Sequence, residues 1–502
     1  MRKPFDPEDD KPAAYDHTLR RKTRWSILWT VLRIASDQVS SFVVFVILAR
    51  LLSPAEFGIF ALAMAFSEIS RVIAVRGMVQ NITRSKKLTP ALADTVFWTN
   101  LVMSLIVSLA VLALAPLIMG LIGEPAGAAP LQALGFVMPI AALGATHLSL
   151  RLREFGHKSL ALRSVLGGTI GGAAAIAAAF AGWGIWSLVV QRFVTETVNM
   201  IMSWHSYPWI PGRNFSMDQL RATWVFGFDM CLTQIMAILP QRVMDVIIGT
   251  VLGVSAVGLN RTARRTNQLI MAGTINPFTV VASQTLSRLQ NDSTEMLKAY
   301  RWMLSKSAML TCPALIGFGV LAPDAVPALF GAKWTDSGVL VQIFTFMVVP
   351  YAVSSFTSPM LLALGRGATL RIFALGQVIS TIVFTLAAAP FGLMAVAWSS
   401  VVRSYLALPF QLLVLRKASG VRPQDALAAI AAPLIASLIM GAGVWVLMQL
   451  IRPYFTIVLI PIFICVAAGM AMYAILLYAI SKNARAIARR QIKTFRTRLL
   501  KK

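Results

Sequence analysis

Residues 47–60, which read ILARLLSPAEFGIF, interrupt a strongly apolar part of the chain. Serine is a favoured helix N-cap, and Ser53 is followed by Pro54, a residue type that suits the first helical position. Glu56 stands where a capping box places its carboxylate. One helix is therefore predicted to end near Leu52 and another to start at once, which makes a tight hairpin between two apolar helices.

The composition is that of a membrane protein. Of the 502 residues, 57% are hydrophobic and only 13% are charged, and the mean hydropathy is +0.72. Soluble domains rarely exceed half apolar, whereas this chain repeats runs of about 20 apolar residues, enough for a helix to cross a bilayer. The first 24 residues are polar, so we expect no cleavable signal peptide.

We expect an all-α integral membrane protein with about 14 transmembrane helices. Lysine and arginine gather in the loops assigned to the cytoplasm, and the outer loops hold only Arg50, Lys333 and Arg452. This asymmetry follows the positive-inside rule if both termini are cytoplasmic. The predicted spans are 26–50, 55–78, 95–121, 130–150, 160–181, 184–206, 219–250, 255–287, 296–322, 336–362, 367–389, 392–415, 424–449 and 455–480.

The opening stretch returns 200 residues later as IIGTVLGVSAVGLN, which aligns Leu52 with Leu252 and Gly58 with Gly258. Weaker matches follow in the same order, at offsets that drift only slightly. Because each unit holds six predicted spans, both units begin on the same side of the membrane, as in a parallel repeat. Two six-helix lobes followed by a C-terminal helix pair are a transporter architecture, with the binding site expected between the lobes near the midplane.

The repeat sets the expected domain limits. Residues 1–24 form a cytoplasmic N-terminal segment, 25–208 the N-lobe with spans one to six, and 209–418 the C-lobe with spans seven to twelve. Spans 13 and 14 occupy 419–481, and 482–502 form a basic cytoplasmic tail. The tail is expected to be either an amphipathic helix on the anionic leaflet or a solvated segment.

Three arginines lie where lipid would make them costly. Arg261, Arg264 and Arg265 fall inside span 255–287, and a central arginine costs about 2.5–3.5 kcal/mol on insertion scales. This half-helix should therefore line a wet cavity or pair with acids. Neighbouring cations without interleaved acids resemble an anion site more than a structural network, so we expect a substrate-binding role.

The other charges within spans come mostly as pairs at helical spacing, and such a pair can neutralise itself. Arg33 and Asp37 are the better candidates for a site, because the first helix of a lobe usually borders the cleft. These pairs are Arg33 with Asp37, Glu68 with Arg71, Arg192 with Glu196, and Arg242 with Asp245.

Two charges have no local partner in sequence. Arg403, near the middle of span 392–415, falls about where Arg192 falls in the first lobe, so both join the candidate binding residues. Asp229 is an isolated acid. Together with Asp37, Glu196 and Asp245 it is a candidate for binding a coupling proton or sodium ion, or for holding the arginines as a structural acid.

The sequence offers little for catalysis. Its four histidines are scattered, with no pair at metal-ligand spacing. It has no Walker motif, so nucleotide cannot power transport on this chain. The basic residues are dispersed among loops, which argues against nucleic acid as a partner. We expect no catalytic residues, no metal site and no cofactor beyond a coupling ion.

Several stretches together resemble the polysaccharide transporter family, within the superfamily of multidrug, oligosaccharidyl-lipid and polysaccharide exporters. They are LARLLSPAEFG (48–58), GWGIWSLVVQ (182–191), RVMDVIIGTVLGVSAVGLNRTAR (242–264), SQTLSRLQND (283–292), LAPDAVPALFGAKW (321–334) and LLALGR (361–366). The resemblance covers about residues 25–420. One departure is Asn260, where the family usually has an aromatic residue.

This resemblance implies a Wzx-like flippase of the exopolysaccharide and capsule branch, in the bacterial inner membrane. Such a protein moves undecaprenyl-diphosphate-linked oligosaccharide repeat units from the cytoplasmic to the periplasmic leaflet for exopolysaccharide or lipopolysaccharide synthesis, by alternating access. It implies membrane lipids and the polymerase and chain-length machinery as partners. Independently, a lipid diphosphate needs cations inside the membrane, and arginine suits bidentate phosphate contact.

Two other functions stay open. A multidrug or cation antiporter of the same superfamily would share the fold, although Arg261, Arg264 and Arg265 would repel a cationic drug. An integral-membrane polysaccharide polymerase or ligase would handle the same lipid-linked sugar. Such an enzyme usually carries a sizeable external loop with catalytic residues, whereas the outer loops here are short.

Overall fold

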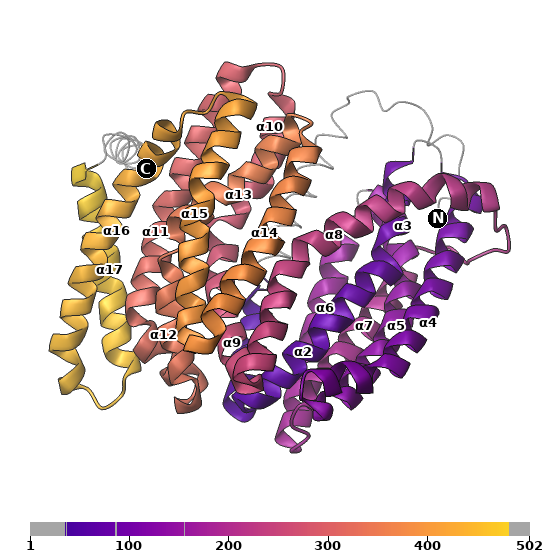
Figure 1. Cartoon of the computed structure of the whole chain (residues 1–502), viewed down its shortest axis with the longest axis horizontal. Coiled ribbons are helices and arrows are strands. Elements are labelled where there is room, and N and C mark those ends of the chain that lie inside the picture. The colour runs from indigo at the N-terminus through magenta and orange to yellow at the C-terminus, as the bar shows by residue number, and fades with distance from the viewer. Residues whose placement is uncertain (1–35, 37, 86–87, 155, 481–502) are drawn as a thin grey trace, which may run out of the picture. The chain divides into compact units, whose positions relative to one another are not determined.

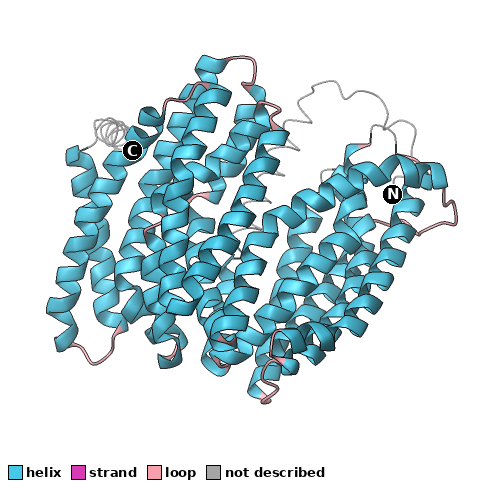
Figure 2. Ribbon diagram, viewed as in Figure 1, coloured by secondary structure: helices cyan, strands magenta, loops and turns pink. Residues whose placement is uncertain are grey.

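A computed structural model describes residues 36, 38–85, 88–154 and 156–480. In this part of the chain the regular elements are helices, and no strand is present (Figure 2). The predicted N-terminal segment 1–24, the basic tail 482–502, and the candidates Arg33 and Asp37 lie outside the described residues. The all-α fold predicted from the sequence is confirmed for the rest.

The helices follow one another with short connections (Figure 1). A helix over Gln38–Leu51 comes first. The others are α2 (Pro54–Arg71), the π-helix η2 (Val72–Arg76), α3 (Gly77–Arg84), α4 (Pro90–Leu121), η3 (Pro125–Gly127), α5 (Ala128–Arg153), α6 (His157–Phe180), α7 (Trp186–Ser206), α8 (Met217–Leu252), α9 (Val254–Thr274), α10 (Asn276–Arg288), α11 (Ser293–Phe330), η4 (Ala332–Trp334), α12 (Thr335–Thr345), α13 (Val348–Ala363), α14 (Gly367–Ala388), η5 (Ala389–Phe391), α15 (Leu393–Ser419), α16 (Pro423–Ile451), η6 (Arg452–Tyr454) and α17 (Leu459–Ile480).

Ten helices of the described chain are long and apolar enough to cross a membrane, or eleven if α12 and α13, bent by 64°, form one broken span. The predicted count of 14 is therefore not confirmed, although the described residues of the predicted spans are mostly helical. The helices α7 and α9 are not among the ten, because Arg192 and Glu196 in α7 and the polar residues of α9 lower their hydropathy.

The predicted hairpin at residues 47–60 is confirmed in detail. The helix over Gln38–Leu51 stops, and α2 starts at Pro54 with Ser53 as its N-cap. The Ser53 hydroxyl oxygen accepts the Glu56 N–H at 3.3 Å, and Glu56 Oε2 accepts the Ser53 N–H at 2.7 Å. This reciprocal pair satisfies two N–H groups that a helix start otherwise leaves unpaired.

The two copies of the repeated stretch contact each other at matching positions. A Cβ at Gly58 of α2 would overlap the Val254 carbonyl of α9, and a Cβ at Gly258 would overlap the Pro54 carbonyl. Each hypothetical Cβ also lies 3.2 Å from the backbone nitrogen of the other glycine. The contact is reciprocal, and the two glycines are those that the repeat aligns at an offset of 200 residues.

The chain divides into two compact units. The first runs as far as Arg261 and includes 374–390, and the second comprises 262–373 and the chain from Phe391 onward. Helix α8 packs against α2, α3 and α4 and so belongs to the first unit. The lobe limits drawn from the repeat stay predictions.

The loop between α7 and α8 is fixed to the start of α4. Asp94 Oδ1 accepts the Gly212 N–H at 2.9 Å, and its Oδ2 accepts the Asn214 N–H at 3.2 Å. Trp98 Nε1 donates to the Gly212 carbonyl at 2.9 Å. The loop that joins the two repeats is therefore anchored within the first unit.

Replacing Asp94 by alanine should lower the stability of the protein, because two backbone N–H groups lose a charged acceptor. At the usual worth of such hydrogen bonds the loss is about 2–4 kcal/mol. The thermal unfolding midpoint of the purified protein measures it, with Asp218→Ala as the control, since Asp218 is an exposed acid in the first turn of α8. An Asp94 variant as stable as the control would contradict the anchoring role.

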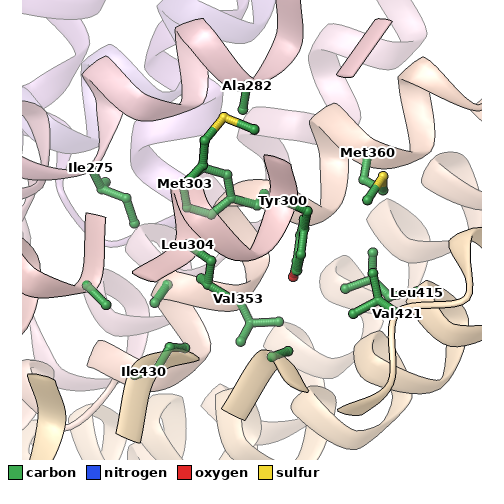
Figure 3. Packing of buried hydrophobic residues seen from close by; sticks show 14 of the residues in the cluster. Ile275, Ala282, Tyr300, Met303, Leu304, Val353, Met360, Leu415, Val421 and Ile430 are labelled. Carbon is green, nitrogen blue, oxygen red and sulfur yellow. The ribbon is translucent and has the colours of Figure 1, made fainter. Parts of the chain in front are cut away.

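The second unit has its own hydrophobic core, formed by α10, α11, α13, α15 and α16 (Figure 3). Tyr300 of α11 lies at its centre, fully buried, with its ring edge-on to Phe356 of α13 at 6.3 Å between centroids. In the described part of the chain its hydroxyl has no hydrogen-bond partner. This packing holds α13 and α15, which carry two of the site residues described next.

Candidate functional site

Helix α9 carries the three clustered arginines predicted from the sequence. It begins at Val254, directly after Gly253, whose φ of 84° breaks the chain from α8. Arg261, Arg264 and Arg265 are all half-buried. Arg261 Nη1 donates to the backbone carbonyl of Ala61 on α2 at 3.0 Å, just beyond the glycine contact.

The polar residues around these arginines are buried as well. Asn260 and Thr262 are each 1% exposed, and Asn267 is 3% exposed. Each has at least one side-chain polar atom without a hydrogen-bond partner among the described residues, and for Asn260 this holds for both amide atoms. Buried polar atoms are nearly always satisfied by protein, water or ligand, so this helix has capacity for further polar contacts.

In the second unit, Arg264 of α9 and Arg403 of α15 form a cluster with Tyr351 of α13. The three side chains lie within electrostatic range of one another. The prediction named both arginines, and the structure brings them together from helices far apart in sequence. We call Arg264, Tyr351 and Arg403 the second-unit cluster.

Neighbouring contacts fix the helices of this cluster at the same level. Ser404 Oγ donates to Met347 Sδ at 3.3 Å, and the Tyr405 hydroxyl donates to the Phe346 carbonyl at 2.9 Å. These residues adjoin Arg403 on α15 and lie about one helical turn before Tyr351. The position of Arg403 beside Tyr351 is thus set by helix packing and not by the two side chains alone.

In the first unit, three arginines surround one buried carboxylate. Glu196 Oε1 accepts from Arg71 Nη1 at 2.7 Å and lies 3.1 Å from Arg192 Nη2. Arg163 of α6 adds a third positive charge near Glu196, and its Nε donates to the Asn199 carbonyl at 3.1 Å. We call Arg71, Arg163, Arg192 and Glu196 the first-unit cluster.

The predicted pairs at helical spacing are partly confirmed. Arg192 pairs with Glu196 as expected, and Arg242 Nη1 pairs with Asp245 Oδ2 at 3.3 Å.

The predicted pair of Glu68 with Arg71 is wrong. Glu68 pairs with Arg242 of α8, and Arg71 pairs with Glu196 of α7. The ion-pair partners of Glu68 and Arg71 are therefore decided by the helices packed against α2, and not by the spacing of these residues within α2.

The acids proposed for a coupling ion have different environments. Asp245 is fully buried and held by Arg242, and Glu196 faces three arginines, which disfavour a cation at either carboxylate. Asp229 is exposed on α8 and not buried as its position in an apolar run suggested.

One residue in each cluster, Arg163 in the first unit and Tyr351 in the second, was not predicted from the sequence. Arg163 lies near the end of a predicted span next to a basic cytoplasmic loop, so the positive-inside rule accounts for it without any role in a site. Tyr351 carries no charge, and its neighbours in sequence are apolar. Only the packing of α6 on α7, and of α13 on α15, reveals their partners.

The fold is shared with solved membrane transporters. The structure of the lipid II flippase MurJ in an inward closed conformation superposes on this chain with a TM-score of 0.69, covering 91% of this chain and 98% of its own at 13% identity. At that identity the likeness shows a shared fold. The chain is a multi-pass membrane protein with a transporter fold.

The family is shown by sequence. Residues 47–339 match the family described as polysaccharide biosynthesis protein, and the chain belongs to that family. The succinoglycan biosynthesis transport protein ExoT of Rhizobium meliloti is 27% identical over 70% of this chain and 72% of its own length. The lipopolysaccharide biosynthesis protein WzxC of Escherichia coli is 22% identical over 70% and 71%.

Proposed function

We propose that this protein is a flippase that moves polyprenyl-diphosphate-linked oligosaccharide repeat units, with undecaprenyl as the lipid, from the cytoplasmic to the periplasmic leaflet. The product serves exopolysaccharide or lipopolysaccharide synthesis. Family membership and the transport and biosynthesis roles named for the two relatives support the substrate class. The shared fold with MurJ supports movement by alternating access.

The observation that carries the proposal is the second-unit cluster. Arg264 and Arg403 lie within electrostatic range of each other, on helices that the proposal places within the membrane, where a buried charge costs several kcal/mol. A diphosphate can stabilise such charges, because guanidinium groups bind phosphate oxygens in bidentate fashion. The Tyr351 hydroxyl can donate one more hydrogen bond. Arg261 and Arg265 extend the same positively charged helix.

The proposal places the protein in the bacterial inner membrane with both termini in the cytoplasm. Membrane lipids surround it, and the polymerase and chain-length machinery receive its product. A proton or sodium ion is proposed to drive transport. The exposed Asp229 suits such an ion better than Asp245 or Glu196, whose arginine partners repel cations.

The charge of the site argues against the two other functions. A cation antiporter needs acids to hold its substrate, whereas the second-unit cluster joins two arginines and a tyrosine. A polymerase needs catalytic groups outside the membrane, yet the connections at Ser53, Glu124 and Gly253, which the proposal places on the periplasmic side, are short.

Deletion of the gene should abolish surface polysaccharide, because repeat units would no longer reach the periplasm. Expression of the intact protein should restore it. The measurement is the amount of high-molecular-weight polysaccharide at the cell surface, with total lipid-linked repeat units as the control for synthesis. Normal surface polysaccharide in the deletion strain would contradict the proposal.

A further inference from the structure

Asn267 of α9 carries a buried amide oxygen that lacks a donor. The residue is 3% exposed, and its Oδ1 has no hydrogen-bond partner among the described residues. Buried polar atoms are nearly always paired with protein, water or ligand, because an unpaired one lowers stability. The oxygen therefore needs a donor that the described part of the chain does not supply.

The nitrogen of the same amide fixes its orientation. Asn267 Nδ2 donates to the Ala263 carbonyl of its own helix at 3.4 Å and to the Val341 carbonyl of α12 at 3.5 Å. The reversed amide would place its oxygen against these two carbonyl oxygens, which are acceptors as well. Oδ1 is therefore held as an acceptor, and only a group that donates a hydrogen bond can pair with it.

Asn267 lies less than one helical turn from Arg264 of the second-unit cluster, within the same compact unit. Side chains three residues apart are neighbours on one helix face, and the helical rise between these two residues is about 4.5 Å. Helix α12, which Asn267 contacts through Val341, packs against α15, the helix that carries Arg403. The amide therefore belongs to the same part of the second unit as the two arginines.

The chemistry of the proposed substrate gives the arginines and the amide oxygen different partners. A diphosphate offers acceptor oxygens, which suit the guanidinium groups of Arg264 and Arg403 but not an amide oxygen. The prenyl chain offers no polar atom. The saccharide does offer donors, in its hydroxyl groups and in the N–H of an acetamido group, and its first sugar is bonded directly to the diphosphate.

We propose that Asn267 Oδ1 accepts a hydrogen bond from the sugar next to the diphosphate, donated by a hydroxyl or an acetamido N–H. This inference rests on the proposed function and deepens it, because it adds a saccharide contact to the diphosphate contacts of the second-unit cluster. A site with a buried acceptor discriminates against a ligand that lacks the matching donor. Asn267 is then a specificity-determining residue that distinguishes a glycosylated prenyl diphosphate from the bare lipid carrier.

Binding of two kinds of probe to the purified full-length protein tests the role of Asn267. One is a short-chain prenyl diphosphate, and the other is the same molecule carrying one glucose, galactose or N-acetylglucosamine. The ratio of the two affinities isolates the sugar. For at least one sugar, Asn267→Leu should shift this ratio against the sugar-bearing probe by about three- to tenfold, because one hydrogen bond is lost. The bare probe should bind as it does to the wild type.

The matched control is Gln268→Leu, which removes an exposed amide from the next residue of α9 and should leave the ratio unchanged. Asn267→Ala removes the buried amide without adding bulk, and it should shift the ratio in the same direction as Asn267→Leu. Calorimetry measures the affinities, and the thermal unfolding midpoint reports whether each variant is folded.

Three results would overturn the proposal. The first is an unchanged ratio for every sugar in both Asn267 variants, and the second is an equal shift in Gln268→Leu. The third is a failure of both Asn267 variants to fold or to bind the bare probe, which would assign the amide to the structure or to the diphosphate site itself.

The bare probe separates this inference from the proposed function. A wild-type protein that binds neither probe would contradict the diphosphate site on which both rest. A wild-type protein that binds the bare probe, with a ratio that Asn267 does not control, would overturn the sugar contact alone and leave the diphosphate site standing.

Discussion

Replacing Arg264 and Arg403 together by glutamine is expected to abolish polysaccharide export while the protein remains inserted and folded. Both arginines lie within electrostatic range of Tyr351 in the second unit, and the diphosphate would lose the guanidinium contacts proposed there. Loss of a buried charge-assisted contact costs about 1.5–3 kcal/mol, so two such losses predict at least a hundredfold fall in export. Surface polysaccharide, normalised to the amount of membrane-inserted protein, measures the effect.

Lysine at both positions should restore only part of the activity, because a point charge lacks the bidentate geometry of a guanidinium. The matched control is Arg416→Gln, since Arg416 is an exposed arginine in the last turn of α15. Near-normal export by the well-expressed double glutamine variant would exclude the second-unit cluster as the diphosphate site. Loss of the protein from the membrane would assign the two arginines a structural role instead.

The second large effect concerns the glycine contact of the two repeats. Gly258→Ala should destabilise the protein by about 3 kcal/mol or more, because the new methyl group meets the backbone carbonyl of Pro54 and a backbone cannot move aside as a flexible side chain can. Gly58→Ala should also destabilise the protein, because its methyl group meets the backbone carbonyl of Val254. The thermal unfolding midpoint of the purified protein reports both.

Gly273→Ala is the control on the same helix, since a Cβ at Gly273 meets no atom within 4 Å. Alanine there should be neutral or stabilise the helix by about 0.5–1 kcal/mol. If Gly258→Ala proves as stable as Gly273→Ala, the close approach of α2 and α9 at this position is refuted.

Local rules predicted the start of α2 correctly from the sequence. The capping box of Ser53 and Glu56 depends on residues within one turn, and such contacts can be read from spacing. The second break, between α8 and α9, could be located only through the repeat, because Gly253 has no cap of that kind. The repeat aligned Gly58 with Gly258, but their contact was found only in the structure.

The number of membrane-spanning helices could not be determined from hydropathy alone, because some helices, such as α9, carry charged residues. A helix that carries charged residues such as Arg261 and Arg265 is less apolar than a helix that faces lipid on all sides. Its polar composition therefore weakens the very signal by which spans are counted. The bend of 64° between α12 and α13 breaks another predicted span into two helices.

The sequence named Arg264 and Arg403 as candidates, because burying charge in an apolar run is costly enough to demand a reason. The structure places them within electrostatic range of each other, and their role in binding stays a prediction. Which charges meet depends on helix packing, and spacing within one helix gave the wrong partner for Glu68. Arg163 and Tyr351 gave no signal, since each has an ordinary explanation where it stands in the sequence.

The leaflet that holds the lipid-linked repeat unit in a deletion strain tests the proposed function most directly. Membrane vesicles of known orientation, treated with an impermeant enzyme that cleaves the saccharide head, report how much substrate faces each side. The account predicts complete repeat units confined to the cytoplasmic leaflet, and their return to the periplasmic leaflet when the intact protein is expressed. Unpolymerised repeat units accumulating on the periplasmic leaflet of the deletion strain would contradict it and would point to a polymerase.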